Sequence, residues 1–169
     1  MVMSNSSTKP SVVLFIYGAG GHRTEMRRLM QTLKLRGKEG AFQYISLGDG
    51  ILGEDALAHF PAKDVRDKHS RMRSMKLFVT SSVQLFKQVR EIKAHFDISG
   101  IVSTGPGIAI FPFFIFQKSG VKTIFLETFC RFETKSITGR IMYHIADRFL
   151  VQNIELLRLY PKAEYCGRL

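Results

Sequence analysis

The sequence predicts an α/β fold built on a Rossmann-like, doubly wound parallel sheet. Short apolar runs alternate along the chain with segments of helical periodicity, and several of these runs end in glycine-rich turns. The length of 169 residues suits one domain of ordinary size. We therefore expect a flexible N-terminus over residues 1–11 and a single domain over residues 12–169.

The expected strands are short apolar runs. Residues 12–17 form a continuous run that ends in glycines, which is typical of a strand buried on both faces of a parallel sheet. The other predicted strands cover residues 42–47, 101–103, 123–127 and 149–152, with weaker candidates at 62–66 and 163–166.

The expected helices lie between these strands. Residues 22–35 carry apolar side chains at i, i+3, i+4 and i+7, the pattern of an amphipathic helix, and Thr24 and Glu25 stand in its first turn, where they can cap it. Further helices are predicted over residues 75–96, 108–116 and 136–146. Ligands of such sheets bind at the carboxyl ends of the strands. The loops expected to carry function therefore cover residues 18–24, 48–50, 104–107 and 127–136.

Positive charge is the dominant feature of the composition. A formal net charge of +11 predicts an anionic partner: nucleic acid, phospholipid or a phosphorylated small molecule. The densest basic stretch includes Lys63, Arg66, Arg71 and Arg73. We interpret it either as a solvated loop or as a contact with anionic lipid headgroups, where each basic group contributes about 1 kcal/mol.

Apolar sequence and cysteines indicate the compartment. No apolar run approaches the roughly 20 residues that a spanning helix needs, so we expect any membrane attachment to be peripheral. Phe111, Phe113 and Phe114 lie in the apolar segment 108–116, which either packs in the core or dips into a membrane interface. The two cysteines form no CxxC pair, and we expect reduced thiols of an intracellular protein.

Two glycine-rich loops follow predicted strands. In the first, GAGGHRTE over residues 18–25, the glycines let backbone N–H groups approach a ligand, and the helix N-terminus that follows favours an anion. Arg23 stands where a dinucleotide-binding GxGxxG motif needs its third glycine, and the Gly-Lys-Ser/Thr end of a P-loop is absent. The second loop, TGPG over residues 104–107, strengthens the prediction of a ligand crevice. The alternative for each loop is a plain tight turn between strand and helix.

Two side chains at these loops are candidates for acid–base chemistry. His22 stands at the mouth of the predicted crevice, and the pKa range of histidine suits a general base, although loop histidines are often caps or surface groups. Glu127 ends a strand in the same crevice, where it could orient His22, bind a ligand hydroxyl, act as the base or pair with Arg131. The sequence contains no HExxH, paired-cysteine zinc spacing or DxD motif, so we expect no metal.

The chain contains, in order, GAGGHRTE at 18–25, STGPG at 103–107, ETFCR at 127–131, SITGR at 136–140, AD at 146–147, FLVQ at 149–152, YP at 160–161 and GR at 167–168. Taken in this order, the motifs resemble the acceptor-binding, membrane-side subunit of the two-part UDP-N-acetylglucosamine transferase of asparagine-linked glycosylation. They equally resemble its bacterial PssD-like relatives in exopolysaccharide synthesis. The match covers nearly the whole chain from about Val12, although Asn153 stands where many relatives have Trp.

This resemblance implies the N-terminal half of a GT-B glycosyltransferase of the MurG kind. It implies a separate donor-binding partner subunit, a polyprenyl-diphosphate-linked acceptor, a UDP-sugar co-substrate, no cofactor, and docking on the cytoplasmic face of a membrane, for which we expect a bacterial inner membrane over the endoplasmic reticulum. His22 and Glu127 become the candidate catalytic residues. The residues implied to contact the acceptor or its phosphates are Gly18, Gly20, Gly21, Arg23, Thr24, Thr104, Gly105, Gly107 and Arg131.

Two other functions remain open from the sequence. The chain could be a catalytically silent scaffold that recruits the donor subunit to a membrane. It could also be a basic nucleic-acid-binding module, although no RNP motif, helix-turn-helix spacing or zinc finger supports this alternative, and we expect no nucleic acid partner.

Overall fold

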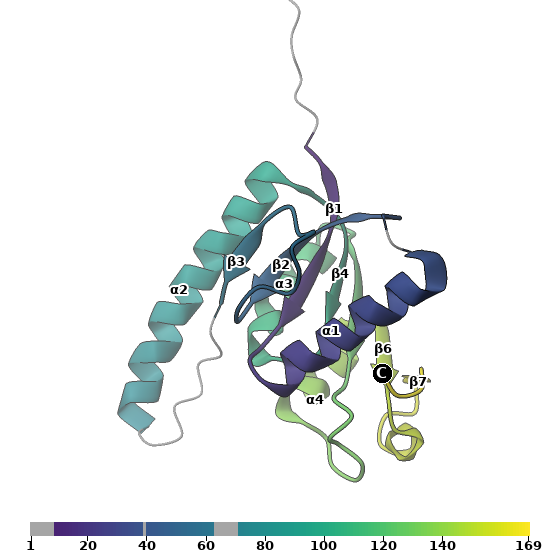
Figure 1. Ribbon diagram of the computed structural model, residues 1–169. Coiled ribbons are helices and arrows are strands. Elements are labelled where there is room, and N and C mark those ends of the chain that lie inside the picture. Colours follow the sequence, from purple (N-terminus) through teal and green to yellow (C-terminus); the bar gives the residue numbers. More distant parts are fainter. Residues whose placement is uncertain (1–8, 39, 63–70) are drawn as a thin grey trace, which may run out of the picture.

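The structure is a computed structural model that describes residues 9–38, 40–62 and 71–169. A seven-stranded, wholly parallel sheet runs through it in the order β3-β2-β1-β4-β5-β6-β7 (Figure 1). The strands are β1 Ser11–Tyr17, β2 Gln43–Gly48, β3 His59–Pro61, β4 Asp97–Ser103, β5 Lys122–Leu126, β6 Arg148–Val151 and β7 Glu164–Tyr165. The α-helices are α1 Gly21–Leu33, α2 Arg71–His95, α3 Ile110–Gln117 and α4 Ile137–Ile145. Shorter turns of helix are η1 Lys34–Lys38, η2 Gly107–Ala109 and η3 Ile154–Arg158.

Helices cover both faces of the sheet, as the doubly wound class requires. Alternate residues of β1 point to opposite faces, because successive side chains of a strand do so. Phe15 and Tyr17 pack with Met26 of α1 in one apolar cluster, whereas Leu14 and Ile16 belong to a larger cluster with α2, α3 and α4. In Figure 1, α1 crosses the front of the sheet and α3 lies behind it. The predicted fold class is confirmed.

The predicted elements occur in the predicted order, but several of their bounds differ; β4, for example, begins at Asp97 and not at residue 101. The weak strand expected at residues 62–66 is β3 at His59–Pro61, and Lys63 and Arg66 lie outside the described residues. Strand β1 begins at Ser11, one residue before its predicted start, and the Pro10 carbonyl accepts a hydrogen bond from the Asp97 amide at 3.0 Å. Arg71 and Arg73 begin α2, but their side chains are also outside the described part.

The first helix begins differently from the prediction. The expected capping by Thr24 and Glu25 is wrong: within the described chain no side chain caps α1, and the Thr24 hydroxyl donates to the Gly20 carbonyl instead. In α4, by contrast, Ser136 is a regular N-cap whose hydroxyl oxygen accepts from the Gly139 amide at 2.7 Å.

The phenylalanine-rich helix α3 is mainly a core element. Phe113 is fully buried, so its prediction as a membrane contact is wrong, and it packs edge-on against Phe125 of β5. Phe111 is half-buried and Phe114 is 49% exposed, so these two reach the surface. Among the described residues, no helix has the length and apolar character needed to cross a bilayer.

Candidate active site

The two glycine loops meet at the point where the sheet changes direction. β1 pairs with β2 on one side and with β4 on the other, so the loops that follow β1 and β4 are neighbours at the carboxyl edge. Gly18 lies so close to the second loop that an added Cβ would stand 3.0 Å from the Cβ of Pro106. The two loops therefore pack directly against each other at this edge of the sheet.

His22 lies between the two loops and is held by the second. Its Nδ1 is 2.6 Å from the Thr104 carbonyl oxygen, and the Thr104 hydroxyl donates back to the His22 carbonyl at 2.8 Å. A carbonyl only accepts, so Nδ1 carries a proton and Nε2 carries the lone pair of the neutral ring. The side chain is 31% exposed. A partly exposed imidazole in this tautomer is arranged to take a proton from a ligand through Nε2.

Gly105 makes this arrangement sterically possible. Its φ of +118° lies in the region that favours glycine, and an added Cβ would stand 2.8 Å from Cε1 and 3.0 Å from Nδ1 of the His22 ring. The loop backbone therefore packs directly on the imidazole, which only a residue without a side chain permits.

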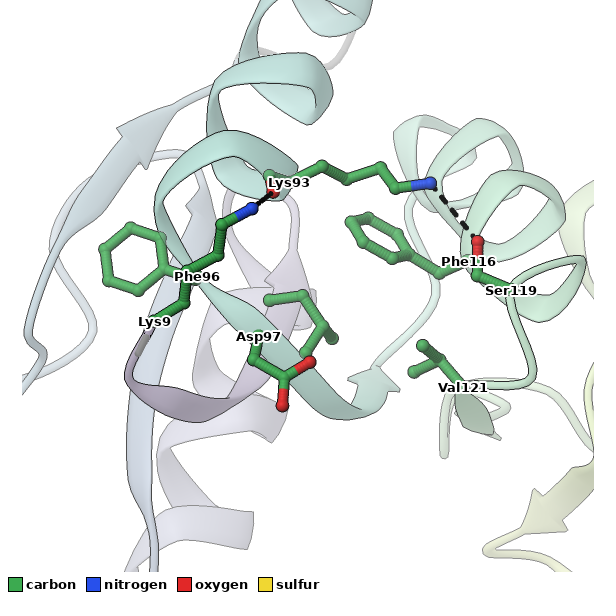
Figure 2. A pocket seen from close by; sticks show the side chains of 8 residues that line it. Lys9, Lys93, Phe96, Asp97, Phe116, Ser119 and Val121 are labelled. Atoms are coloured by element: carbon green, nitrogen blue, oxygen red, sulfur yellow. Dashed lines mark hydrogen bonds between the residues drawn. The ribbon is translucent and has the colours of Figure 1, made fainter. Parts of the chain in front are cut away.

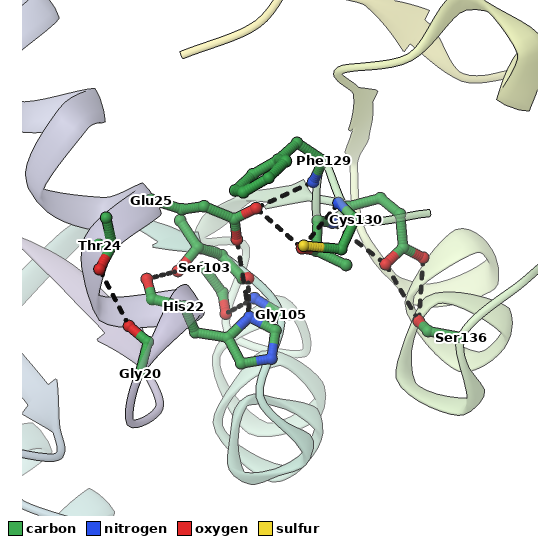
Figure 3. Close-up of polar contacts among 12 residues, drawn as sticks. Gly20, His22, Thr24, Glu25, Ser103, Gly105, Phe129, Cys130 and Ser136 are labelled. Carbon is green, nitrogen blue, oxygen red and sulfur yellow. Dashed lines mark hydrogen bonds and ion pairs between the residues drawn. The ribbon is translucent and has the colours of Figure 1, made fainter. Parts of the chain in front are cut away.

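The carboxylate beside His22 belongs to Glu25, which the sequence analysis placed only as a helix cap. Glu25 is fully buried, and its Oε2 lies 3.7 Å from His22 Nδ1 (Figure 3). Its Oε1 accepts hydrogen bonds from the Thr128 hydroxyl at 2.8 Å and the Phe129 amide at 2.9 Å. The signal in the sequence was the spacing of three residues from His22, which places both side chains on one face of a helix.

Glu127 does not have the surroundings expected of a catalytic residue. It is 1% exposed, and its carboxylate accepts from the Ser136 hydroxyl, the Thr128 amide and the Tyr160 hydroxyl at 3.0–3.3 Å. Burial raises the pKa of this carboxyl, and the hydrogen bond from Ser136 opposes the rise. The predicted ion pair with Arg131 is absent from the described contacts, since the Arg131 guanidinium donates to Thr134 Oγ1. The geometry thus gives Glu127 a structural place at the start of α4.

Residues after β6 complete the site and were missed as contacts. Gln152 is buried, and its side-chain amide donates to the Glu127 carbonyl at 3.2 Å and to Glu25 Oε1 at 3.4 Å. Asn153 donates to the carbonyls of Phe129 and Arg131, both at 2.6 Å. Together the two side chains hold the loop between β5 and α4. The hydrogen bonds to Phe129 and Arg131 give Asn153 a structural role in this chain.

Of the remaining residues predicted to contact the acceptor, some have free space around them and others are already bonded within the protein. Gly20 and Gly21 at the start of α1 face open space, since an added Cβ would meet nothing within 4 Å in the described structure. Arg23 is engaged with the loop after β2, where its guanidinium donates to the Asp49 carbonyl at 3.2 Å. Gly107 starts η2, and Arg131 is exposed.

A separate groove of about 200 Å³ lies at the opposite edge of the sheet. Figure 2 shows Lys93 reaching across it to Ser119, while Lys9 donates to the Lys93 carbonyl. It borders Asp97, the first residue of β4, and so lies at the amino end of the strands. Doubly wound folds bind their ligands at the other edge, so the region around His22, where the two glycine loops meet, is the candidate site.

The described part of the chain contains no candidate metal site. In it, no three His, Cys, Asp or Glu residues lie close enough together to hold an ion. Cys130 and Cys166 are free and exposed. Independence from metal stays a prediction.

Comparison with solved structures defines the class of this fold. The structure is similar to MurG from Acinetobacter baumannii, with a TM-score of 0.54 and 11% identity over 84% of this chain and 41% of that one. It is similar to a UDP-N-acetylglucosamine 2-epimerase from Rickettsia bellii, with a TM-score of 0.55 and 11% identity over 95% of this chain and 45% of that one. The chain therefore has the fold of one Rossmann-like half of a GT-B glycosyltransferase.

The family model of Alg14-like oligosaccharide biosynthesis proteins matches residues 13–169. The chain belongs to this family, which confirms the resemblance seen in the motifs.

Curated relatives named UDP-N-acetylglucosamine transferase subunit ALG14 match along most of their length. The protein from Kluyveromyces lactis is 27% identical over 93% of this chain and 78% of the relative. The protein from Schizosaccharomyces pombe is 27% identical over 98% of this chain and 87% of the relative. The human protein is 24% identical over 93% of this chain and 82% of the relative. These relatives are eukaryotic, so the expectation of a bacterial inner membrane has no support among them.

Proposed function

We propose that this chain is the acceptor-binding subunit of a two-subunit glycosyltransferase that transfers N-acetylglucosamine from its UDP-sugar to a polyprenyl-diphosphate-linked acceptor. The observation that carries the proposal is the placement of His22 between two glycine loops, with Nδ1 bound to the Thr104 carbonyl at 2.6 Å. Membership of the Alg14-like family and the name of the relatives, a transferase subunit, support the reaction class.

In the proposed site, the start of α1 receives the acceptor diphosphate. Backbone N–H groups at a helix N-terminus lack partners within the helix, and the helix dipole favours an anion there. Gly20 and Gly21 leave this end uncovered by side chains of their own. Thr24 and Arg23 add polar and basic side chains to the same turn.

His22 acts as the general base in this proposal. Its Nε2 takes the proton of the acceptor hydroxyl as that oxygen bonds to the anomeric carbon, and the bond from this carbon to the UDP oxygen breaks. UDP leaves with the electron pair of that bond. Backbone N–H groups and helix dipoles of both subunits stabilise the diphosphate charge, so the reaction needs no metal.

The partner subunit supplies the donor site in this proposal. The chain matches 41% of MurG, so it corresponds to one half of such an enzyme. We place part of the partner contact on residues 152–169, where Ile154 is 58% exposed and Tyr165 is 51% exposed. Apolar side chains at this level of exposure suit the core of a protein–protein interface.

The test is reconstitution. Transfer from radiolabelled UDP-N-acetylglucosamine to a synthetic polyprenyl-diphosphate acceptor should require both this chain and its donor-binding partner, and should persist in EDTA. Transfer by the partner alone at the full rate would contradict an acceptor-binding role. Loss of transfer in EDTA, restored by a divalent ion, would contradict the metal-independent mechanism.

Membrane contact is proposed for one surface that α2 and α3 share, on the cytoplasmic side of the bilayer. We define the α2–α3 patch as Val83, Phe86, Phe111 and Phe114. Phe86 is 53% exposed and its ring lies 5.9 Å from that of Phe111, while Lys118 Nζ lies 4.3 Å from the Phe114 ring centroid. Phenylalanines bordered by lysines match an interface of apolar lipid and anionic headgroups.

Replacing Phe86 and Phe114 together by serine should therefore reduce binding to vesicles with anionic lipid by about 30-fold, since two half-exposed rings each lose about 1 kcal/mol of burial in the interface. Co-sedimentation with vesicles measures this. The control is Leu35→Ser, because Leu35 is 89% exposed but lies in η1, outside α2 and α3. Equal losses in both proteins would contradict the assignment of the patch.

A further inference from the structure

We propose that Glu25 is a positioning residue for His22: it stabilises the protonated imidazole and ties it to the loop between β5 and α4. This inference rests on the proposed role of His22 as the base. It concerns the negative charge of a buried carboxylate, which the hydrogen bonds of the fold do not require.

One oxygen of Glu25 performs a structural task. Oε1 accepts from the Thr128 hydroxyl at 2.8 Å, from the Phe129 amide at 2.9 Å and from the Gln152 side chain at 3.4 Å. The donors come from the loop after β5 and from the end of β6. Through this oxygen, α1 is joined to the loop between β5 and α4 (Figure 3).

The other oxygen has a different environment. Oε2 is buried, has no hydrogen-bond donor among the described residues, and lies 3.7 Å from His22 Nδ1. A buried carboxylate is costly unless its charge is paired and hydrogen-bonded. A glutamine could accept the same three hydrogen bonds through its own Oε1 without that cost. The structural task therefore leaves the negative charge unexplained.

The charge has a use when His22 accepts a proton. Proton transfer to Nε2 makes the ring an imidazolium, and the positive charge is shared by Nδ1, the atom nearest to Glu25. A carboxylate at this distance favours the charged ring. The hydrogen bond from Nδ1 to Thr104 keeps the ring oriented throughout, so Glu25 supplies charge and Thr104 supplies direction.

Charged groups on the neighbouring elements make hydrogen bonds of their own, among them Arg28 of α1, which donates to the Leu169 carbonyl. On α1, Arg23 is directed to the Asp49 carbonyl. On the loop after β5, the Glu127 carboxylate is directed to Ser136 and Tyr160, and the Arg131 guanidinium to Thr134. Their hydrogen bonds direct each of these groups elsewhere, and the ion pair of His22 is with Glu25.

The test is Glu25→Gln in the complex with the donor-binding partner. The acid limb of kcat/KM against pH should move to lower pH by about one unit, since removing an adjacent negative charge disfavours the imidazolium. We expect kcat to fall about 10- to 100-fold, while the KM for the lipid acceptor changes less than threefold. Glu54→Gln is the matched control, because Glu54 is an exposed glutamate on a distant loop.

Two more variants separate charge from structure. Thr128→Val removes one donor to Oε1 and keeps the carboxylate, so the acid limb should stay in place even if the chain becomes less stable. Glu25→Asp keeps the charge with a shorter side chain, and its acid limb should lie near that of the unmodified protein. If Thr128→Val moves the limb as far as Glu25→Gln does, the role of Glu25 is only structural and the inference is overturned.

A second readout does not depend on activity. In the full chain labelled with ¹⁵N-histidine, NMR should show His22 protonated on Nδ1 when neutral, and Glu25→Gln should lower the midpoint of its titration. If His22→Gln keeps full turnover, the proposed base is wrong, but a lowered midpoint would still establish the link to Glu25. An unchanged midpoint, with His22→Gln inactive, overturns the inference alone. If Glu25→Gln does not fold, the tautomer of His22 in the unmodified chain is the test. A neutral His22 ring protonated on Nε2 would overturn the proposed role of Glu25.

Discussion

Replacing His22 with glutamine should lower the kcat of the assembled transferase by about 10²- to 10⁴-fold, the range that a general base contributes. Glutamine is close to histidine in size, and its side-chain amide has no basic nitrogen to take the acceptor proton. The KM for the UDP-sugar should stay nearly constant, because the donor site belongs to the partner in our proposal. Steady-state assays of the reconstituted pair on a lipid-linked acceptor measure both constants.

The control for this experiment is His95→Gln. His95 ends α2, is exposed, and bonds through Nδ1 to the Glu91 carbonyl, far from the carboxyl edge of the sheet. Its replacement should leave turnover unchanged. If His22→Gln also keeps full turnover in a complex that still co-purifies, this chain acts as a scaffold that brings the donor subunit to the membrane.

Gly139→Ala should lower the free energy of unfolding by about 3 kcal/mol, combining overpacking with loss of a helix cap. An added Cβ would stand 1.8 Å from Glu127 Oε2, 2.7 Å from Ser136 Oγ and 2.8 Å from the Tyr160 hydroxyl. All three groups belong to one hydrogen-bonded cluster at the start of α4. The methyl group must therefore displace a buried carboxylate or the helix itself.

Thermal and urea unfolding measure this loss, and we expect a fall in Tm of roughly 6–12 °C for a domain of this size. Gly100→Ala is the matched control, because its added Cβ would meet only the Lys122 carbonyl at an ordinary 3.6 Å. A Tm for Gly139→Ala within 2 °C of that control would show that Glu127 is not packed over Gly139, and would reopen its assignment to the crevice.

The choice between Glu25 and Glu127 illustrates the limit of sequence reasoning for this site. Both are acidic residues of loops or helix starts at the carboxyl edge, and Glu127 directly ends a strand, which made it the more obvious candidate. The structure turns Glu127 toward Ser136 and Tyr160 and places Glu25 beside His22. Side-chain direction depends on contacts between residues about a hundred positions apart, such as Glu25 and Phe129, which local patterns do not record.

The same distinction applies to the apolar helix α3. Its composition indicated burial or membrane contact, but composition cannot separate Phe113 from its neighbour Phe114. Packing against β5 buries the first, while the second stays about half exposed. One helical position turns a side chain by about 100°, so adjacent phenylalanines have different surroundings.

The sequence by itself determined the class of fold, the order of its strands and helices along the chain, the two glycine loops and the family, because periodicity and turn residues act locally and motifs are read in order. Only the tertiary structure decided how the sheet is ordered, which carboxylate lies at His22, and which phenylalanines reach the surface. Those outcomes depend on which segments meet in space. The pairing of β1 with β4 brings Thr104 to His22, and this contact across 82 positions creates the candidate site.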